Sequence, residues 1–167
     1  DYVVADKDIS FEEVIVQTFA ANKLKVAFAE SCTGGNLAGA ITLVPGASQI
    51  FDCGIIAYSN SIKTNILGVE ESVLTEYGAV SEQTVIQMAA GIQKISNADY
   101  TVATSGIAGP GGGTTEKPVG TVWIAVQGKY EVVTKKFEFR NDRRINIERT
   151  IAQALIMLWK LFKKELS

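Results

Sequence analysis

Residues 25–35 read KVAFAESCTGG, and this stretch predicts how the chain is organised. Its first half is a short apolar run typical of a buried strand, and the Ser/Thr/Gly turn leads into a helix expected to begin near Gly35. A strand-to-helix turn lies at the carboxyl edge of a sheet, where open α/β sheets bind ligands. The turn alone supports two interpretations of Ser31 about equally. Ser31 could cap the helix, or it could be a nucleophile beside free helix N–H groups that hold an anion.

The rest of the chain alternates helix and strand patterns. Ser10 and Glu13 form a capping-box pattern ahead of the first helix. Helices are expected over 11–22, 36–44, 61–67, 70–77, 82–95 and 143–163, and further strands over 53–58, 99–104, 119–126 and 131–139. This pattern predicts an α/β fold, a three-layer α/β/α sandwich with a mixed, mainly parallel sheet and a C-terminal antiparallel hairpin. Residues 1–167 are expected to form a single domain, with 1–9 as a polar lead-in.

Composition excludes several classes of protein. The 16 basic and 18 acidic residues form no basic stripe, so no nucleic-acid partner is expected. Apolar runs are too short to cross a membrane, no signal-peptide pattern begins the chain, and two cysteines form no disulfide framework, so we expect a cytoplasmic protein. The chain has no histidine, which excludes Ser–His and Cys–His catalysis and makes a metal site unexpected. A catalytic base would have to be Lys, Asp, Glu or Tyr.

Lys63 is the candidate base for Ser31. It follows the strand end at Tyr58 by five residues, so the two side chains could converge on one point. As a base it must be neutral near pH 7, which requires a pKa about 3 units below the usual ~10.4. Most lysines are instead solvated on surface helices, and that alternative stays open. Cys32 is a rival nucleophile, but neighbouring residues face opposite ways, so only one of Ser31 and Cys32 is expected to face the cleft.

Residues 105–113 form a second polar segment after a strand. Ser105, Gly106, Gly109 and Gly112 provide N–H donors with little side-chain bulk, which suits an anion or an oxyanion. The alternative is a flexible glycine-rich lid. At the start of the last helix, Arg143 and Arg144 could hold an anion or could be solvated charges.

Taken in order, these motifs resemble the CinA C-terminal domain family, which includes nicotinamide mononucleotide (NMN) deamidases. The resemblance covers about Phe11 to Phe162 and rests on six blocks: AESCTGG (29–35), YSNxxK (58–63), LGV (67–69), GAVS (78–81), SGIAGPxGG (105–113) and KPVGTV (117–122). It implies hydrolysis of the NMN carboxamide to nicotinate mononucleotide and ammonia, in pyridine nucleotide recycling. It implies no metal or other cofactor and a homo-oligomer.

The resemblance also implies residue roles. Ser31 would be the nucleophile, Lys63 its general base, and Tyr58 an assistant in proton transfer or lysine positioning. The substrate-binding residues would be Thr33, Gly34, Gly35, Ser105, Gly106, Gly109, Gly112 and Arg143. Oxyanion donors could come from residues 33–35 or from 105–106.

Two departures from the family pattern matter. Ile147 stands where members often have a second arginine, which puts affinity or specificity in question. The additional N-terminal domain of two-domain members has no counterpart, so a stand-alone deamidase is expected. A protein of another class, a non-catalytic nucleotide-binding module or sensor, could use the same glycine-rich loops.

Overall fold

The structure, a computed structural model, describes residues 9–167. Its elements follow the order α1 (Phe11–Ala21), β1 (Val26–Glu30), α2 (Asn36–Thr42), η1 (Ala47–Gln49), β2 (Phe51–Ile56), α3 (Asn60–Asn65), α4 (Glu71–Tyr77), α5 (Glu82–Ile95), β3 (Tyr100–Gly106), β4 (Thr121–Gln127), β5 (Val132–Glu138) and α6 (Arg143–Leu166). Within the described residues, no helix is long and apolar enough to cross a bilayer.

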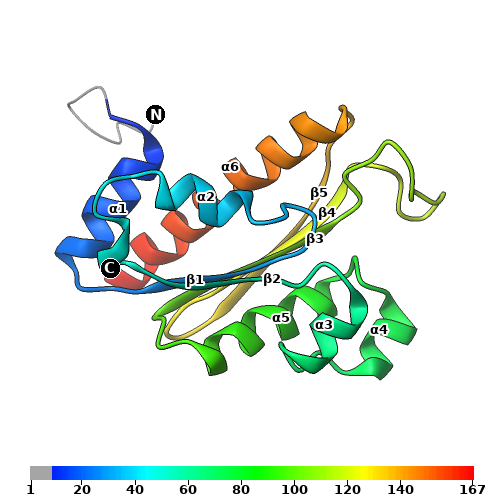
Figure 1. Ribbon diagram of the computed structural model, residues 1–167, viewed down its shortest axis with the longest axis horizontal. Helices are drawn as coiled ribbons and strands as arrows, with labels where there is room; N and C mark the ends of the chain where they lie inside the picture. Colours follow the sequence, from blue (N-terminus) through cyan, green and yellow to red (C-terminus); the bar gives the residue numbers. More distant parts are fainter. Residues whose placement is uncertain (1–8) are drawn as a thin grey trace.

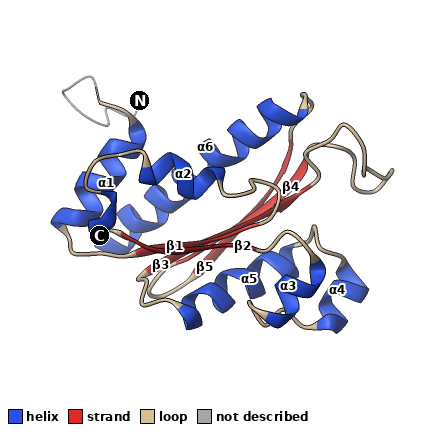
Figure 2. Ribbon diagram, in the orientation of Figure 1, coloured by secondary structure: helices blue, strands red, loops and turns tan. Residues whose placement is uncertain are grey.

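The five strands form one mixed sheet in the order β2-β1-β3-β4-β5. β1 pairs in parallel with β2 and β3, whereas β4 runs antiparallel to both β3 and β5. Four strands therefore share one direction and β4 opposes them. Helices α1, α2 and α6 cover one face of the sheet, and α3, α4 and α5 cover the other (Figures 1 and 2). The expected three-layer fold and its antiparallel hairpin are confirmed.

Alternation along β1 sends different side chains to the two faces. Val26 and Phe28 belong to a core cluster with residues of α1, α2 and α6, whereas Ala27 and Ala29 belong to a second cluster with residues of α5. The smaller side chains on the second face leave room for close helix packing. A Cβ on Gly91 of α5 would lie 1.9 Å from the Leu67 carbonyl oxygen, so only glycine lets the segment after α3 pack this closely.

Most boundaries agree closely with expectation, and two strand ends differ. The Ser10–Glu13 capping box forms as predicted. β2 ends at Ile56 rather than at residue 58, because Ser59 instead caps α3 by accepting the Ile62 N–H. β3 continues through Gly106, since Ser105 and Gly106 still pair with β4. The predicted lead-in at 1–9 lies almost wholly outside the described residues.

Candidate active site

Ser31 lies immediately after β1, the strand between the two other parallel strands. Its N–H donates to the carbonyl oxygen of Thr104 in β3 over 2.9 Å, so the sheet ladder fixes the serine at the carboxyl edge. The side chain is buried among the residues that line a cavity of about 270 Å³. The fold thus presents one hydroxyl, rigidly held, at the edge where ligands bind in α/β sheets.

Lys63 reaches this hydroxyl from the short helix α3. Its Nζ lies 3.1 Å from Ser31 Oγ, 2.7 Å from the Ala57 carbonyl oxygen and 3.3 Å from the Tyr58 carbonyl oxygen. Only 1% of the lysine is exposed. Among the described residues no carboxylate lies within ion-pair distance of it. Burial lowers the pKa of Lys63 below its ordinary value.

These three contacts fit a neutral amine. Nζ donates to both carbonyl oxygens and to Ser31 Oγ; when one proton is lost, two N–H donors remain for the carbonyl oxygens and the lone pair is directed at Ser31 Oγ. A charged ammonium would be buried without a counter-ion, which is unfavourable. Lys63 is therefore placed to accept the proton of Ser31. The alternative of a solvated surface lysine is wrong for this residue.

Tyr58 takes part in two different ways. Its backbone carbonyl helps hold Lys63, whereas its side chain is 60% exposed and its hydroxyl accepts a hydrogen bond from Arg143 Nη2 at 3.0 Å. No hydrogen bond joins the phenol to Lys63 among the described contacts. Of the two expected roles, lysine positioning has a structural counterpart, and it runs through the backbone.

The cavity brings most of the predicted site residues together. Its lining consists of Ser31, Cys32, Tyr58, Asn60, Lys63, Ala79, Val80, Ser105, Gly106, Ile107, Ala108, Gly109, Gly111, Gly112 and Arg143. The Ser105 hydroxyl also has a structural role, because its Oγ donates a hydrogen bond to the Ala79 carbonyl oxygen at 2.7 Å. The three predicted binding residues Thr33, Gly34 and Gly35 are not in this lining.

Thr33, Gly34 and Gly35 serve the turn. Thr33 is fully buried, with its Oγ1 2.8 Å from Thr104 Oγ1, so its side chain faces the protein interior. Gly34 and Gly35 adopt φ values of 58° and 93°, a region in which side chains are strained. Their backbone conformation therefore explains why glycine stands at both positions, and the predicted substrate contact stays a prediction.

Glu30 occupies the helix N-terminus that the sequence suggested was free for an anion. Its carboxylate accepts hydrogen bonds from the N–H groups of Leu37 (2.8 Å) and Ala38 (3.0 Å), in the first turn of α2. Gly35, at the capping position, makes no side-chain cap bond. The last residue of β1 therefore takes the place of a cap, so the predictions of an anion site and of a Ser31 cap at this helix are wrong.

Cys32 also lines the cavity, so both neighbours reach it. Cys32 is buried and belongs to the apolar core cluster. Burial raises the pKa of its thiol to about 12, which disfavours the thiolate that nucleophilic attack requires. The hydroxyl that contacts a base is that of Ser31.

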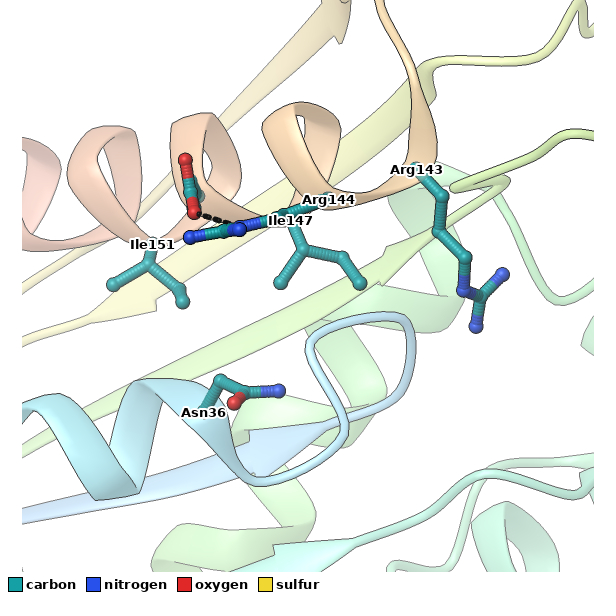
Figure 3. Close-up of a pocket in the computed structure, with 6 residues that line it drawn as sticks. Asn36, Arg143, Arg144, Ile147 and Ile151 are labelled. Carbon is teal, nitrogen blue, oxygen red and sulfur yellow. Dashed lines mark hydrogen bonds and ion pairs between the residues drawn. The ribbon is translucent and has the colours of Figure 1, made fainter.

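Arg143 closes one side of the cavity from the start of α6. Its Nη1 donates to the Gly109 carbonyl oxygen at 2.8 Å, and its charge faces no carboxylate within ion-pair distance among the described residues. Arg144 is instead paired with Glu148 at 2.9 Å. Arg143 points away from Ile147 and Ile151 (Figure 3). It therefore offers an unneutralised cation to the cavity.

A second cleft adjoins the first at Arg143. It has a volume of about 470 Å³ and is lined by Asn36, Arg143, Arg144, Ile147, Glu148 and Ile151 (Figure 3). Ile147 and Ile151 give it an apolar floor. The isoleucine that departs from the family pattern thus lines a cleft that shares Arg143 with the cavity around Ser31.

Comparison with known proteins assigns the chain to a family. The family model for the CinA C-terminal domain matches residues 8–162. The chain belongs to the CinA C-terminal domain family. It is 45% identical over 163 residues to a CinA-like protein of Thermotoga maritima and 56% identical over 124 residues to one of Akkermansia muciniphila. These alignments cover 98% and 74% of this chain but 40% and 30% of those proteins, so the chain spans well under half their length.

Solved CinA structures share the whole fold. The competence/damage inducible protein CihA of Agrobacterium tumefaciens superposes with a TM-score of 0.88 at 40% identity, covering 94% of this chain and 99% of that one. A CinA superfamily protein of Escherichia coli gives 0.88 at 33% identity, covering 94% and 92%. Within residues 9–167, no cluster of three or more potential metal-ligating side chains occurs.

Sequence reasoning about this CinA domain missed two buried polar residues. Glu30 carried a signal, since a carboxylate ending an otherwise apolar strand needs hydrogen-bond donors. Asn146 carried none, because a single asparagine on an amphipathic helix is unremarkable. In the structure its Nδ2 donates to the carbonyl oxygens of Ala108 (3.0 Å) and Asn141 (2.9 Å).

Proposed function

We propose that this CinA domain hydrolyses the carboxamide of nicotinamide mononucleotide to nicotinate mononucleotide and ammonia. The observation that carries the proposal is the 3.1 Å contact between Ser31 Oγ and a buried Lys63 Nζ that has no acidic partner among the described residues. A serine paired with a neutral lysine is an activated nucleophile. The identity of the substrate rests on the resemblance to NMN deamidases.

The reaction proceeds through an acyl-enzyme. Ser31 Oγ attacks the carboxamide carbon as its proton passes to Lys63 Nζ, and the carbonyl π electrons move onto oxygen. The tetrahedral intermediate collapses as Lys63 returns the proton to the departing nitrogen, which leaves as ammonia. Water, deprotonated by Lys63, then attacks the ester and releases the nicotinate carboxylate and Ser31.

The charges around the cavity suit this substrate. Arg143, which donates only to neutral oxygens among the described contacts, can bind the phosphate. The pyridinium ring carries a positive charge, and a bound cation further favours the neutral form of Lys63. The same charge withdraws electrons from the carboxamide and makes its carbon a better electrophile.

We also propose that the domain works as a cytoplasmic homo-oligomer in pyridine nucleotide recycling. Ile56, Ile62 and Ile66 expose 52%, 37% and 48% of their surface near the β2 edge, and a second copy could cover them. Sedimentation of the purified protein measures the oligomeric state. A monomer at micromolar concentration would contradict this part of the proposal.

One assay tests the activity. The protein is incubated with NMN, and ammonia and nicotinate mononucleotide are quantified for the wild type, Ser31→Ala, Lys63→Met and Cys32→Ser. We expect turnover in the wild type and Cys32→Ser, and a loss of at least about 10³-fold in the other two variants. NMN binding without turnover would instead support the nucleotide-binding module.

A further inference from the structure

Two side chains of α6 hold consecutive carbonyl groups of the loop that follows β3. Arg143 binds the Gly109 carbonyl, and Asn146, one turn later, binds the Ala108 carbonyl at 3.0 Å. Asn146 is 1% exposed, and its Oδ1 has no hydrogen-bond partner among the described residues. Because both partners of its Nδ2 are carbonyl oxygens, the orientation of this amide is determined. The side chain acts through its NH₂ group alone.

The bond from Asn146 fixes the direction of the next peptide N–H. In a trans peptide, the C=O of one residue and the N–H of the following residue point in opposite directions. The Ala108 carbonyl points at Asn146, so the Gly109 N–H points away from it. Ala108 and Gly109 line the cavity that contains Ser31, whereas Asn146 lies outside that lining. This geometry is consistent with a Gly109 N–H that faces the cavity.

Two of the backbone donors near the cavity are already used. The N–H of Ser31 donates to Thr104, and the N–H of Ile107 donates to the Thr121 carbonyl oxygen at 2.9 Å. Among the described backbone contacts, the N–H of Gly109 has no acceptor, and neither have those of its cavity-lining neighbours Ala108, Gly111 and Gly112. The Gly109 N–H is therefore available to a developing negative charge in the cavity.

We propose that Asn146 is a positioning residue that orients the Ala108–Gly109 peptide so that the Gly109 N–H stabilises the oxyanion formed when Ser31 attacks. This inference rests on the proposed amide hydrolysis. It places the oxyanion donor at Gly109, whereas the sequence had suggested residues 33–35 or 105–106. The donor strengthens its bond only as charge develops on the carbonyl oxygen, so it affects the transition state more than the bound substrate.

Two variants remove the positioning bond, and one controls for stability. Asn146→Leu and Asn146→Asp have nearly the shape of asparagine but lack its NH₂ donors. Thr150→Val is the matched control, because Thr150 is equally buried on α6 and its Oγ1 donates to the Asn146 carbonyl oxygen at 2.7 Å. The control loses a buried hydrogen bond of the same helix without touching the loop.

For NMN hydrolysis, we expect kcat to fall about 100-fold in both Asn146 variants while KM changes less than about threefold. Thr150→Val should keep kcat within about twofold of the wild type, even if its unfolding midpoint falls as much as that of the Asn146 variants. An unchanged kcat in Asn146→Leu and Asn146→Asp would overturn the proposal. So would a higher KM at constant kcat, or an equal loss in Thr150→Val.

A second measurement does not depend on activity. In ¹⁵N-labelled protein, the amide resonance of Gly109 should shift and its exchange rate should change in Asn146→Leu but not in Thr150→Val. If the wild type releases no ammonia yet this resonance responds as expected, the hydrolysis proposal fails while the peptide orientation stands. A Gly109 resonance that is identical in all three proteins refutes the orientation itself.

Discussion

Replacing Glu30 with glutamine should weaken the junction between β1 and α2. The carboxylate is 1% exposed and accepts two backbone N–H groups, from Leu37 and Ala38. In Glu30→Gln, one oxygen remains to accept one of these bonds, as a neutral group. The new NH₂ faces the other N–H, so two donors meet and a buried N–H loses its partner.

The magnitude follows from these two bonds. Weakening one charge-assisted bond to a neutral one costs about 1 kcal/mol, and leaving a buried donor unsatisfied costs about 1–3 kcal/mol. Losing a negative charge at a helix N-terminus adds about 0.3–1 kcal/mol. The free energy of unfolding should therefore fall by about 3 kcal/mol.

Urea denaturation followed by circular dichroism measures this change. The midpoint should move to lower urea while the slope of the free energy against urea stays constant, because the surface exposed on unfolding is unchanged. Glu116→Gln, at an exposed loop carboxylate, is the control and should shift the free energy by less than about 0.5 kcal/mol. A loss below about 1 kcal/mol in Glu30→Gln would mean that the carboxylate does not act as the cap of α2.

Four further predictions concern single residues. Because burial lowers the pKa of Lys63, kcat/KM for NMN should rise with pH, with a midpoint below the ordinary lysine pKa. Between the folded-state and unfolded-state pKa values of Lys63, the folded protein binds fewer protons than the unfolded chain, so the free energy of unfolding should rise with pH in that range. This rise should be absent in Lys63→Met. A pH–rate profile that is flat would contradict this. Cys32→Ser should keep kcat within about fivefold, and wild-type Cys32 should react slowly with iodoacetamide in mass spectrometry, because its thiol has a pKa of about 12; rapid alkylation would refute the burial argument. Gly91→Ala should lower unfolding free energy by at least about 2 kcal/mol in a urea titration, since the new Cβ would meet the Leu67 backbone, and an unchanged midpoint would show that α5 can move away. Ile147→Arg should lower KM for NMN by about threefold at low salt, because it places a cation one helical turn from Arg143, and the effect should shrink at high salt; an equal gain at both salt levels would exclude charge as the cause.

Local signals predicted the helix boundaries well. Ser81 caps α5 by accepting the Thr84 N–H, and Gly68 and Gly78 adopt positive φ values after the preceding helices. Each depends on neighbours within a few residues, so the sequence contains the information. The fold class followed from the same kind of pattern, the alternation of helix and strand.

The burial and orientation of the site side chains depend on long-range packing, so local sequence patterns could not predict them. The burial of Lys63 depends on α3 lying against the sheet, which in turn depends on Gly91 letting residue 67 approach α5. The inward orientation of Thr33 depends on Thr104, which is 71 residues away. Neither partner can be identified from local periodicity. Most candidate residues still met in one cavity, because polar residues at parallel strand ends share one sheet edge.

The burial of Lys63 also makes this amine a natural reporter of local opening. Reductive methylation modifies exposed lysines directly, but a side chain that is 1% exposed reacts only when the structure around it opens locally. Its labelling rate in mass spectrometry would therefore measure how often the contact between Ser31 and Lys63 opens in the native protein, without substrate or mutation.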